Sequence, residues 1–240
     1  MRLLALDTAT EACSVALLTE HGLLSDSVEI GRGHAQEILG MVDRILAQGG
    51  ATLASLSGIA AGIGPGSFTG VRVSVAVAQG LAFGAGLPVV PVTSLEALAI
   101  EAIGAGAERV LACLDARMGE VYWGCFVAQA SGMLSAVGPS AVGPPAAVRL
   151  PEGGSYAAAP HFRGIGRGFA AYPELCAIPG LLIESEARRA LPQARAVALL
   201  GAARLAAGAG IDAEFLEPLY LRNKVAMTEA ERGAARRLDK

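Results

Sequence analysis

The stretch GIGPGSFTGVRVSVAVAQGLAFGAGLPVVPV, residues 62–92, decides the fold of this chain. A short apolar run over 56–61 leads into it and predicts a buried strand, which Gly-Pro-Gly at 64–66 ends. Apolar residues at helical spacing predict a helix over 68–83, and the apolar run over 87–92 predicts the next strand. Strand, glycine loop, helix and strand make a parallel βαβ unit, in which the loop presents backbone N–H groups to a ligand.

Residues that favour helix termini mark both ends of this helix. We expect Ser67 or Thr69 to cap its first turn, because their hydroxyl groups can accept hydrogen bonds from free backbone N–H groups. Gly84 and Gly86 are expected to end it.

The residues before this unit predict three antiparallel strands and a helix. The strands cover 3–6, 13–18 and 23–30, and apolar residues at helical spacing place the helix over 34–48. A further helix, capped by Ser94, is expected from there to about residue 103. The resulting order, βββαβαβα, is the ribonuclease-H-like arrangement.

The second half of the chain begins with the same pattern. LLALDTATEACSVALL, around Asp7, and VLACLDARMGEVYWGCF, around Asp115, both read as strand, Leu-Asp, polar turn and strand. We therefore predict an internal duplication. It gives an N-terminal lobe over 1–106 and a smaller C-terminal lobe over 107–220. A helix over 193–207, apolar on nearly every face, is expected to be buried between the lobes.

Composition favours a cytoplasmic protein without a membrane segment. The chain of 240 residues is 53% hydrophobic and 17% charged, but charged residues and prolines interrupt its apolar stretches before they reach the length of a membrane span. The four cysteines form no CxxC pair, which predicts free thiols. The formal net charge of the chain is −3. Residues 221–240 carry +3, so residues 1–220 carry −6. A solvated end is the simpler interpretation of this tail, and contact with RNA or an acidic partner is the alternative.

The residues that carry chemistry do not form a recognisable catalytic set. Asp7 either belongs to a metal–nucleotide site or caps the turn at 8–10. The histidines, at 21, 34 and 161, form no HxxxH or HExxH pair, so we predict no metal site built on paired histidines. The 64–66 loop lacks the Gly-Lys-Ser/Thr ending of a phosphate-binding loop, and no serine lies in a GxSxG setting.

Three segments together resemble one family, TsaB (also called YeaZ), of tRNA threonylcarbamoyladenosine biosynthesis. They are LALDTATEACSVAL, GIGPGSFTGVRVSVAVAQGLAFGAGLPVVPVTSLEALA and LDARMGEVYW. The resemblance implies two duplicated lobes of the actin/Hsp70/sugar-kinase (ASKHA) type and a cytoplasmic, non-catalytic paralogue of the transferase TsaD, with no cofactor. TsaD-like proteins carry a metal-binding HxxxH where this chain has Ser94 and Leu98. The implied vestiges of nucleotide and phosphate loops are Asp7, Thr8, Thr10, Gly64 and Gly66.

The resemblance also implies partners and a surface. A TsaB-like protein is expected to bind and activate TsaD, to assemble it with the ATPase TsaE, and to form a homodimer when TsaD is absent. Helices of the N-terminal lobe would make these contacts, here those over 34–48 and 68–83. The candidate interface residues are Ile38, Met41, Ile45, Gly70, Val71, Arg72, Ser74, Val75 and Ala78. The alternative is that the apolar ones belong to the ordinary core, and that Arg72 is either a solvated edge or an interface ion pair.

Two enzyme hypotheses remain as alternatives to a non-catalytic scaffold that binds TsaD. The first is an ATP-dependent phosphotransferase or ATPase of the same fold, in which Asp7 organises Mg²⁺ and the 64–66 loop lies near the phosphates. GIGRG at 164–168 is then the candidate adenosine loop. The second is a protease, which the missing metal histidines and serine motif disfavour.

Overall fold

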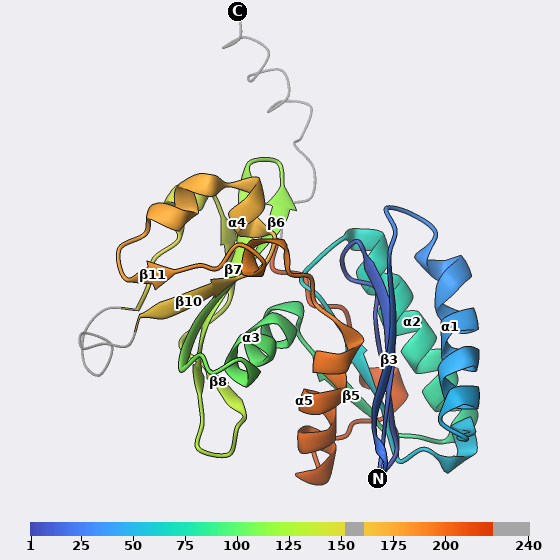
Figure 1. Ribbon diagram of the computed structural model, residues 1–240. Helices are drawn as coiled ribbons and strands as arrows, with labels where there is room; N and C mark the ends of the chain where they lie inside the picture. The colour runs from blue at the N-terminus through green and yellow to red at the C-terminus, as the bar shows by residue number, and fades with distance from the viewer. Residues whose placement is uncertain (152–160, 223–240) are drawn as a thin grey trace, which may run out of the picture.

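The computed structural model describes residues 1–151 and 161–222, and shows a mixed α/β protein with two mixed sheets (Figure 1). The predicted tail at 221–240 lies outside the described residues from residue 223 onward. The helices and strands predicted over the first 127 residues are all present.

The first sheet has the strand order β3-β2-β1-β4-β5. Its first three strands are antiparallel neighbours, and β4 and β5 continue from β1 in parallel. The strands are β1 (Leu3–Asp7), β2 (Ala12–Thr19), β3 (Gly22–Glu29), β4 (Gly58–Gly62) and β5 (Val89–Val92).

Side chains alternate between the two faces of this sheet, and both faces are covered. Leu4 and Leu6 of β1 pack in a core with α1 (His34–Gln48) and α2 (Phe68–Ala85). Leu3 and Ala5 pack on the opposite face with α3 (Ser94–Gly104) and α5 (Ala194–Ala206). Successive residues of a strand point to opposite faces. Because both faces of this sheet are covered, a strand such as β1 is apolar at every position.

The second sheet has the order β11-β10-β6-β7-β8, and β9 also pairs with β7. The strands are β6 (Arg109–Arg117), β7 (Glu120–Ala128), β8 (Leu134–Ala136), β9 (Ala141–Gly143), β10 (Phe162–Ile165) and β11 (Leu181–Leu182). Around it lie α4 (Gly168–Ala171) and the 3₁₀ turns η2 (Pro145–Ala147), η4 (Pro173–Ala177) and η5 (Ala187–Arg189). The first lobe adds η1 (Leu53–Ser55), and η6 (Ala213–Phe215) follows α5.

The two sheets share one connectivity. β6, β7 and β8 are antiparallel neighbours in chain order, as β1, β2 and β3 are. β10 and β11 then extend from β6 in parallel, as β4 and β5 extend from β1. This match agrees with the duplication expected from the two Leu-Asp segments.

The helices α3 and α5 lie between the two sheets (Figure 1). Although α5 comes late in the chain, it packs on the first sheet, where Gly201 allows its backbone to approach β4. A Cβ atom at Gly201 would lie 2.4 Å from the Ala60 Cβ. An ion pair between Glu96 of α3 and Arg204 of α5 joins the two helices.

Helix ends differ from the expected ones by at most one or two residues. Ser67 caps α2, because its hydroxyl oxygen accepts the Gly70 N–H at 3.1 Å. The left-handed Gly86 ends that helix, at φ 64°. The expected cap of α3 at Ser94 is wrong by one position, because Thr93 and Glu96 form a reciprocal capping box.

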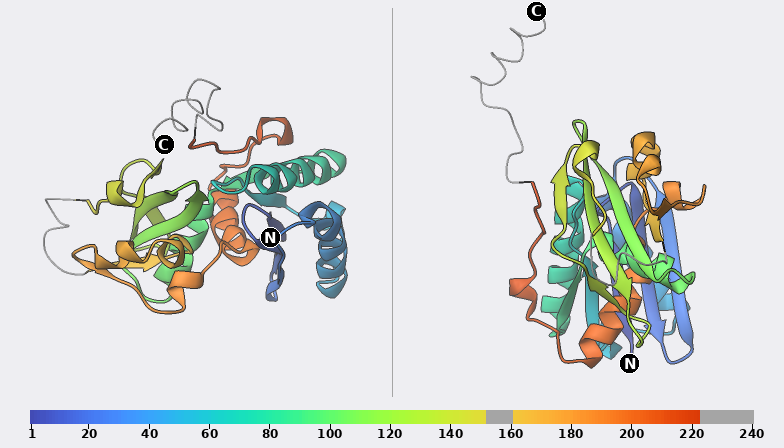
Figure 2. Two further views of the ribbon diagram at one scale, coloured as in Figure 1. Left: turned by 90° about the horizontal axis from the view of Figure 1, so that it is seen from above. Right: turned by 90° about the vertical axis from the view of Figure 1, so that its left-hand side faces the viewer.

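A C-terminal strap, residues 210–222, returns along α2 and then reaches the second sheet (Figure 2). The Gln79 side chain donates to the Leu216 carbonyl at 3.0 Å, and the Leu219 N–H donates to the Ile63 carbonyl at 2.8 Å. Arg222 then pairs with Glu120 of β7. The strap therefore connects both halves of the molecule.

Candidate functional site

The first strand ends in a carboxylate that no solvent reaches. Asp7 is fully buried, and its Oδ1 accepts the N–H of Ala9 at 2.7 Å. Its Oδ2 has no hydrogen-bond partner among the described residues. Burial raises the pKa of Asp7 from 3.8 to about 7, because an apolar environment disfavours the charged carboxylate.

The glycine loop after β4 packs directly against this turn. A Cβ atom at Gly66 would lie 2.1 Å from the Ala9 carbonyl oxygen, and one at Gly70 would lie 2.1 Å from the Thr8 carbonyl oxygen. Thr8 Oγ1 donates to the Gly70 carbonyl at 2.7 Å, and the Ser67 N–H donates to the Ala9 carbonyl at 2.7 Å. These glycines therefore allow two backbone segments to meet, and part of the loop's hydrogen bonding is used within the chain.

Of the expected nucleotide-loop residues, Asp7 and Thr8 lie in the core, and Thr10 and Gly66 line a cleft described below. Gly64 adopts φ 92° and accepts the Ser94 N–H through its carbonyl oxygen at 2.8 Å.

The second lobe repeats the aspartate turn in a more open setting. Asp115 Oδ1 accepts the Arg117 N–H at 2.7 Å, and the Tyr172 hydroxyl lies 3.5 Å from the same oxygen. The GIGRG segment packs against β6, since a Cβ atom at Gly166 would lie 2.2 Å from the Cys113 carbonyl oxygen. The close approach explains this glycine without an adenosine ligand.

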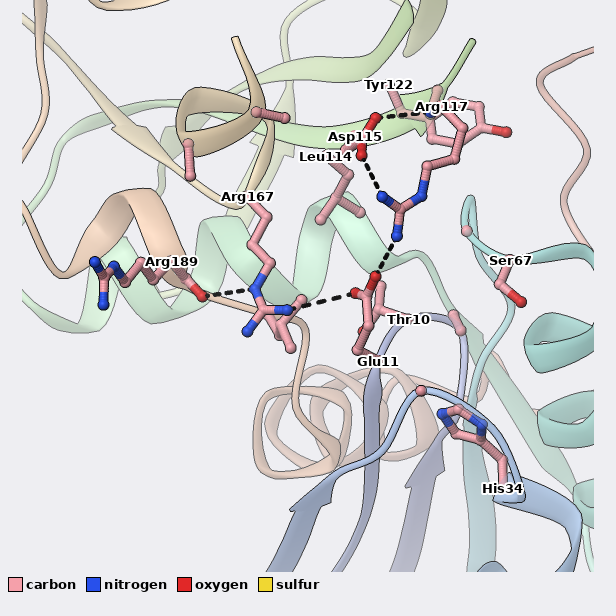
Figure 3. A pocket seen from close by; sticks show the side chains of 17 residues that line it. Thr10, Glu11, His34, Ser67, Leu114, Asp115, Arg117, Tyr122, Arg167 and Arg189 are labelled. Atoms are coloured by element: carbon pink, nitrogen blue, oxygen red, sulfur yellow. Dashed lines mark hydrogen bonds and ion pairs between the residues drawn. The ribbon is translucent and has the colours of Figure 1, made fainter. Parts of the chain in front are cut away.

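A cleft of about 720 Å³ separates the two aspartate turns (Figure 3). Thr10, Glu11 and Ser67 line it from the first lobe, and Asp115, Arg117 and Arg167 from the second. Glu11 pairs with Arg117 at 2.6 Å and faces Arg167 at 3.7 Å. These ion pairs were not expected from the sequence, because they join residues more than a hundred positions apart.

Candidate metal ligands do not gather in the described part of the chain. No group of three or more His, Cys, Asp or Glu side chains lies close enough there to hold a metal ion. Ser94 and Leu98, which stand where the resemblance places metal-binding histidines, are buried in α3. The four cysteines are free thiols, as predicted.

Most of the expected partner residues lie in the core, which was the alternative interpretation. Eight of the nine are buried, and only Arg72 is exposed. The buried ones are Ile38, Met41, Ile45, Gly70, Val71, Ser74, Val75 and Ala78. They face the sheet, because apolar residues at helical spacing mark the side of a helix that covers its own core. In this structure they offer no surface to a partner.

The outer face of α2, defined as Thr69, Arg72, Ala76, Gly80, Phe83 and Gly84, is exposed instead. Phe83 is 84% exposed. At the start of the helix, the Arg72 guanidinium lies 3.4 Å from the centroid of the Phe68 ring and 5.6 Å from that of Tyr220 in the strap. The Arg72 guanidinium therefore lies against two aromatic rings.

This helix is unusually apolar for one that lies at the surface. Its mean hydropathy is 1.3, and 33% of its 18 residues are buried. Length and composition alone would let it cross a membrane, which differs from the expectation that no apolar stretch is long enough. In this structure, however, it is a sheet-covering helix with one open side (Figure 2).

Comparison with known proteins places the chain in a family. Residues 28–230 match the family model for TsaD, tRNA N6-adenosine threonylcarbamoyltransferase. The chain is 41% identical over 231 residues to the Escherichia coli tRNA threonylcarbamoyladenosine biosynthesis protein TsaB, covering 94% of this chain and 96% of that protein. It is 52% identical over 124 residues to TsaB of Haemophilus influenzae, covering 51% of this chain and 52% of that protein.

Solved structures agree with the sequence relatives. The structure of YeaZ from Pseudomonas aeruginosa superposes with a TM-score of 0.82 at 44% identity, covering 92% of this chain and 99% of that one. A second Pseudomonas aeruginosa structure, described as similar to the peptidase YeaZ, has a TM-score of 0.83 and the same identity. The chain therefore belongs to the TsaB (YeaZ) family of tRNA threonylcarbamoyladenosine biosynthesis proteins and is related to TsaD.

Proposed function

We propose that this protein acts in tRNA threonylcarbamoyladenosine biosynthesis as a cytoplasmic, non-catalytic scaffold subunit. It binds and activates a TsaD transferase, assembles it with a TsaE ATPase, and pairs with itself when TsaD is absent. We take its two sheets as duplicated lobes of the ASKHA type, over 1–106 and 107–220. Family membership and the matching connectivity of the two sheets support this assignment.

The observation that carries the proposal is a pair of unexplained glycines. Gly80 and Gly84 lie on the outer face of α2, where a Cβ atom would meet nothing within 4 Å. Glycine inside a helix costs about 1 kcal/mol relative to alanine, and nothing in the chain's own packing requires it at these positions. Small side chains allow a second helix to approach closely, so a partner helix on this face accounts for both.

Spacing and hydropathy support the same surface. Ala76, Gly80 and Gly84 recur every four residues, which places them in one row along the helix. Phe83 and Phe68 flank the two ends of this row and supply apolar area that is half or more exposed. We therefore move the proposed interface from the inner to the outer side of α2.

The competing phosphotransferase hypothesis has weaker support. Asp7 is buried and surrounded by protein, and the glycine loop beside it packs on the Thr8 and Ala9 carbonyl groups. ATP hydrolysis by the purified protein alone, lost on Asp7→Asn, would favour this hypothesis over the scaffold.

Glycine-to-alanine substitution tests the interface without damaging the fold. Gly80→Ala should raise the melting temperature, because alanine favours the helix, and should also weaken binding to the TsaD subunit at least tenfold. Ala76→Arg should abolish that binding. Ala206→Arg, an exposed substitution at the end of α5, is the matched control and should bind normally. Isothermal titration with purified TsaD measures all four proteins, and wild-type affinity for Ala76→Arg would refute the proposed surface.

A further inference from the structure

The cleft between the lobes holds a charged cluster that the scaffold role does not use. Arg117, Arg167 and Arg189 line it from the second lobe. The Glu11 side chain reaches from the turn between β1 and β2 and lies between the first two of these arginines (Figure 3). The cluster therefore joins the two lobes across the cleft.

Each carboxylate oxygen of Glu11 faces a different guanidinium group. Glu11 Oε1 lies 2.6 Å from Arg117 Nη2, and Glu11 Oε2 lies 3.7 Å from Arg167 Nη1. Arg117 also pairs with Asp115 at 2.9 Å, and Arg167 with Glu29 at 2.6 Å. Two guanidinium groups converging on one anion is an arrangement typical of carboxylate and phosphate recognition.

The first lobe adds further hydrogen-bond donors to the same cleft. His34, the first residue of α1, and Ser67, the cap of α2, both line it. The Nε2 atom of His34 is buried and has no partner among the described residues. Both helices begin at the cleft, and the N-terminus of a helix attracts negative charge.

The backbone that presents Arg117 is strained. Arg117 has φ 60° and Met118 has φ 58°, in the left-handed region that residues with a side chain rarely adopt. Such conformations persist where the surrounding structure enforces them and are common at binding sites. Here the Arg222 side chain of the strap donates to the Arg117 carbonyl at 3.4 Å, which helps to fix the turn.

We propose that this cleft is an anion-binding site that the chain's own Glu11 carboxylate occupies in the present structure. A small ligand carrying a carboxylate or phosphate group competes with Glu11 for Arg117 and Arg167, and the cleft of about 720 Å³ accommodates it. The proposal rests on the cleft alone and does not depend on the outer face of α2.

Removing the internal carboxylate tests the proposal. Glu11→Gln keeps the side-chain length but removes the charge, so inorganic phosphate or acetate should bind the full-length variant at least tenfold more tightly than wild type in calorimetric titration. Tighter phosphate than acetate binding would assign a phosphate-bearing ligand, and the reverse would assign a carboxylate.

Two further variants make the result specific to the cleft. Glu20→Gln removes a carboxylate of the same lobe that pairs with Arg2 at 3.0 Å outside the cleft, and should bind as wild type does. The double variant Glu11→Gln/Arg167→Gln should lose the gain while keeping the wild-type circular dichroism spectrum. Equal affinities of wild type and Glu11→Gln, a gain in Glu20→Gln, or a gain that survives in the double variant would each overturn the proposal.

Discussion

The turns after β1 and β6 start from the same local pattern and end in opposite environments. In both, an aspartate Oδ1 accepts the N–H two residues later at 2.7 Å. Asp7 is fully buried, with Gly62 of β4 against its carboxylate, whereas Asp115 lines the cleft and pairs with Arg117. The comparison teaches that both turns border the cleft, but only the second places its aspartate side chain there, while the first holds it in the core.

The largest loss of stability is expected from adding a side chain at Gly66, where the glycine loop contacts the first turn. Gly66→Ala places a Cβ atom 2.1 Å from the Ala9 carbonyl oxygen and should lower the free energy of unfolding by about 3 kcal/mol. Gly80→Ala is the matched control, because its Cβ meets open space, and it should be stabilising. Chemical denaturation measures both, and equal stabilities of the two variants would contradict the account of the first turn.

The two aspartates should respond differently to replacement by asparagine. The folded pKa of Asp7, about 7, lies above its unfolded value near 3.8, so its favourable contribution is present below pH 3.8 and is lost as the pH rises towards 7. Asp7→Asn removes the buried charge and should stabilise the protein by roughly 2 kcal/mol at pH 8. The increase should disappear near pH 4.

Asp115→Asn is the counterpart in the open turn; it removes the ion pair with Arg117 and should lower the stability at pH 8 rather than raise it. Thermal unfolding between pH 4 and pH 8 compares the two variants directly. If Asp7→Asn destabilised the protein at pH 8 as well as at pH 4, the buried carboxylate would have a favourable partner that this account does not include.

A smaller effect is expected where the strap holds the open turn. Arg222 pairs with Glu120 and also donates to the Arg117 carbonyl. Because the pair is partly exposed, Arg222→Gln should lower the free energy of unfolding by about 0.5–1 kcal/mol, and added salt should reduce the difference. A denaturation series at low and high salt checks this, and a loss independent of salt would point to packing instead.

Apolar runs and glycine punctuation were sufficient to predict most of the fold. The strands and helices of the first lobe and the start of the second lobe were all expected from such signals. The short strands β9 and β11 were not, because three- and two-residue strands carry too little periodicity to be recognised.

The candidate site was harder to predict, for a physical reason. Apolar spacing in α2 identifies the side that packs on the sheet, so the residues chosen as an interface, such as Val75, belong to the core. The exposed side of this helix carries a different signal, which is a row of small residues such as Gly80. The Glu11–Arg117 pair gave no sequence signal, because surface charges at distant positions do not indicate that they meet.

The central claim is that the protein supports tRNA modification through the outer face of α2. The most direct measurement is reconstitution of threonylcarbamoyladenosine formation from TsaD, TsaE, threonylcarbamoyl-adenylate and tRNA. We expect product with wild type, Asp7→Asn and Ala206→Arg, and none with Ala76→Arg or without the protein. Full product with Ala76→Arg, or loss with Asp7→Asn while that variant stays folded, would contradict the account.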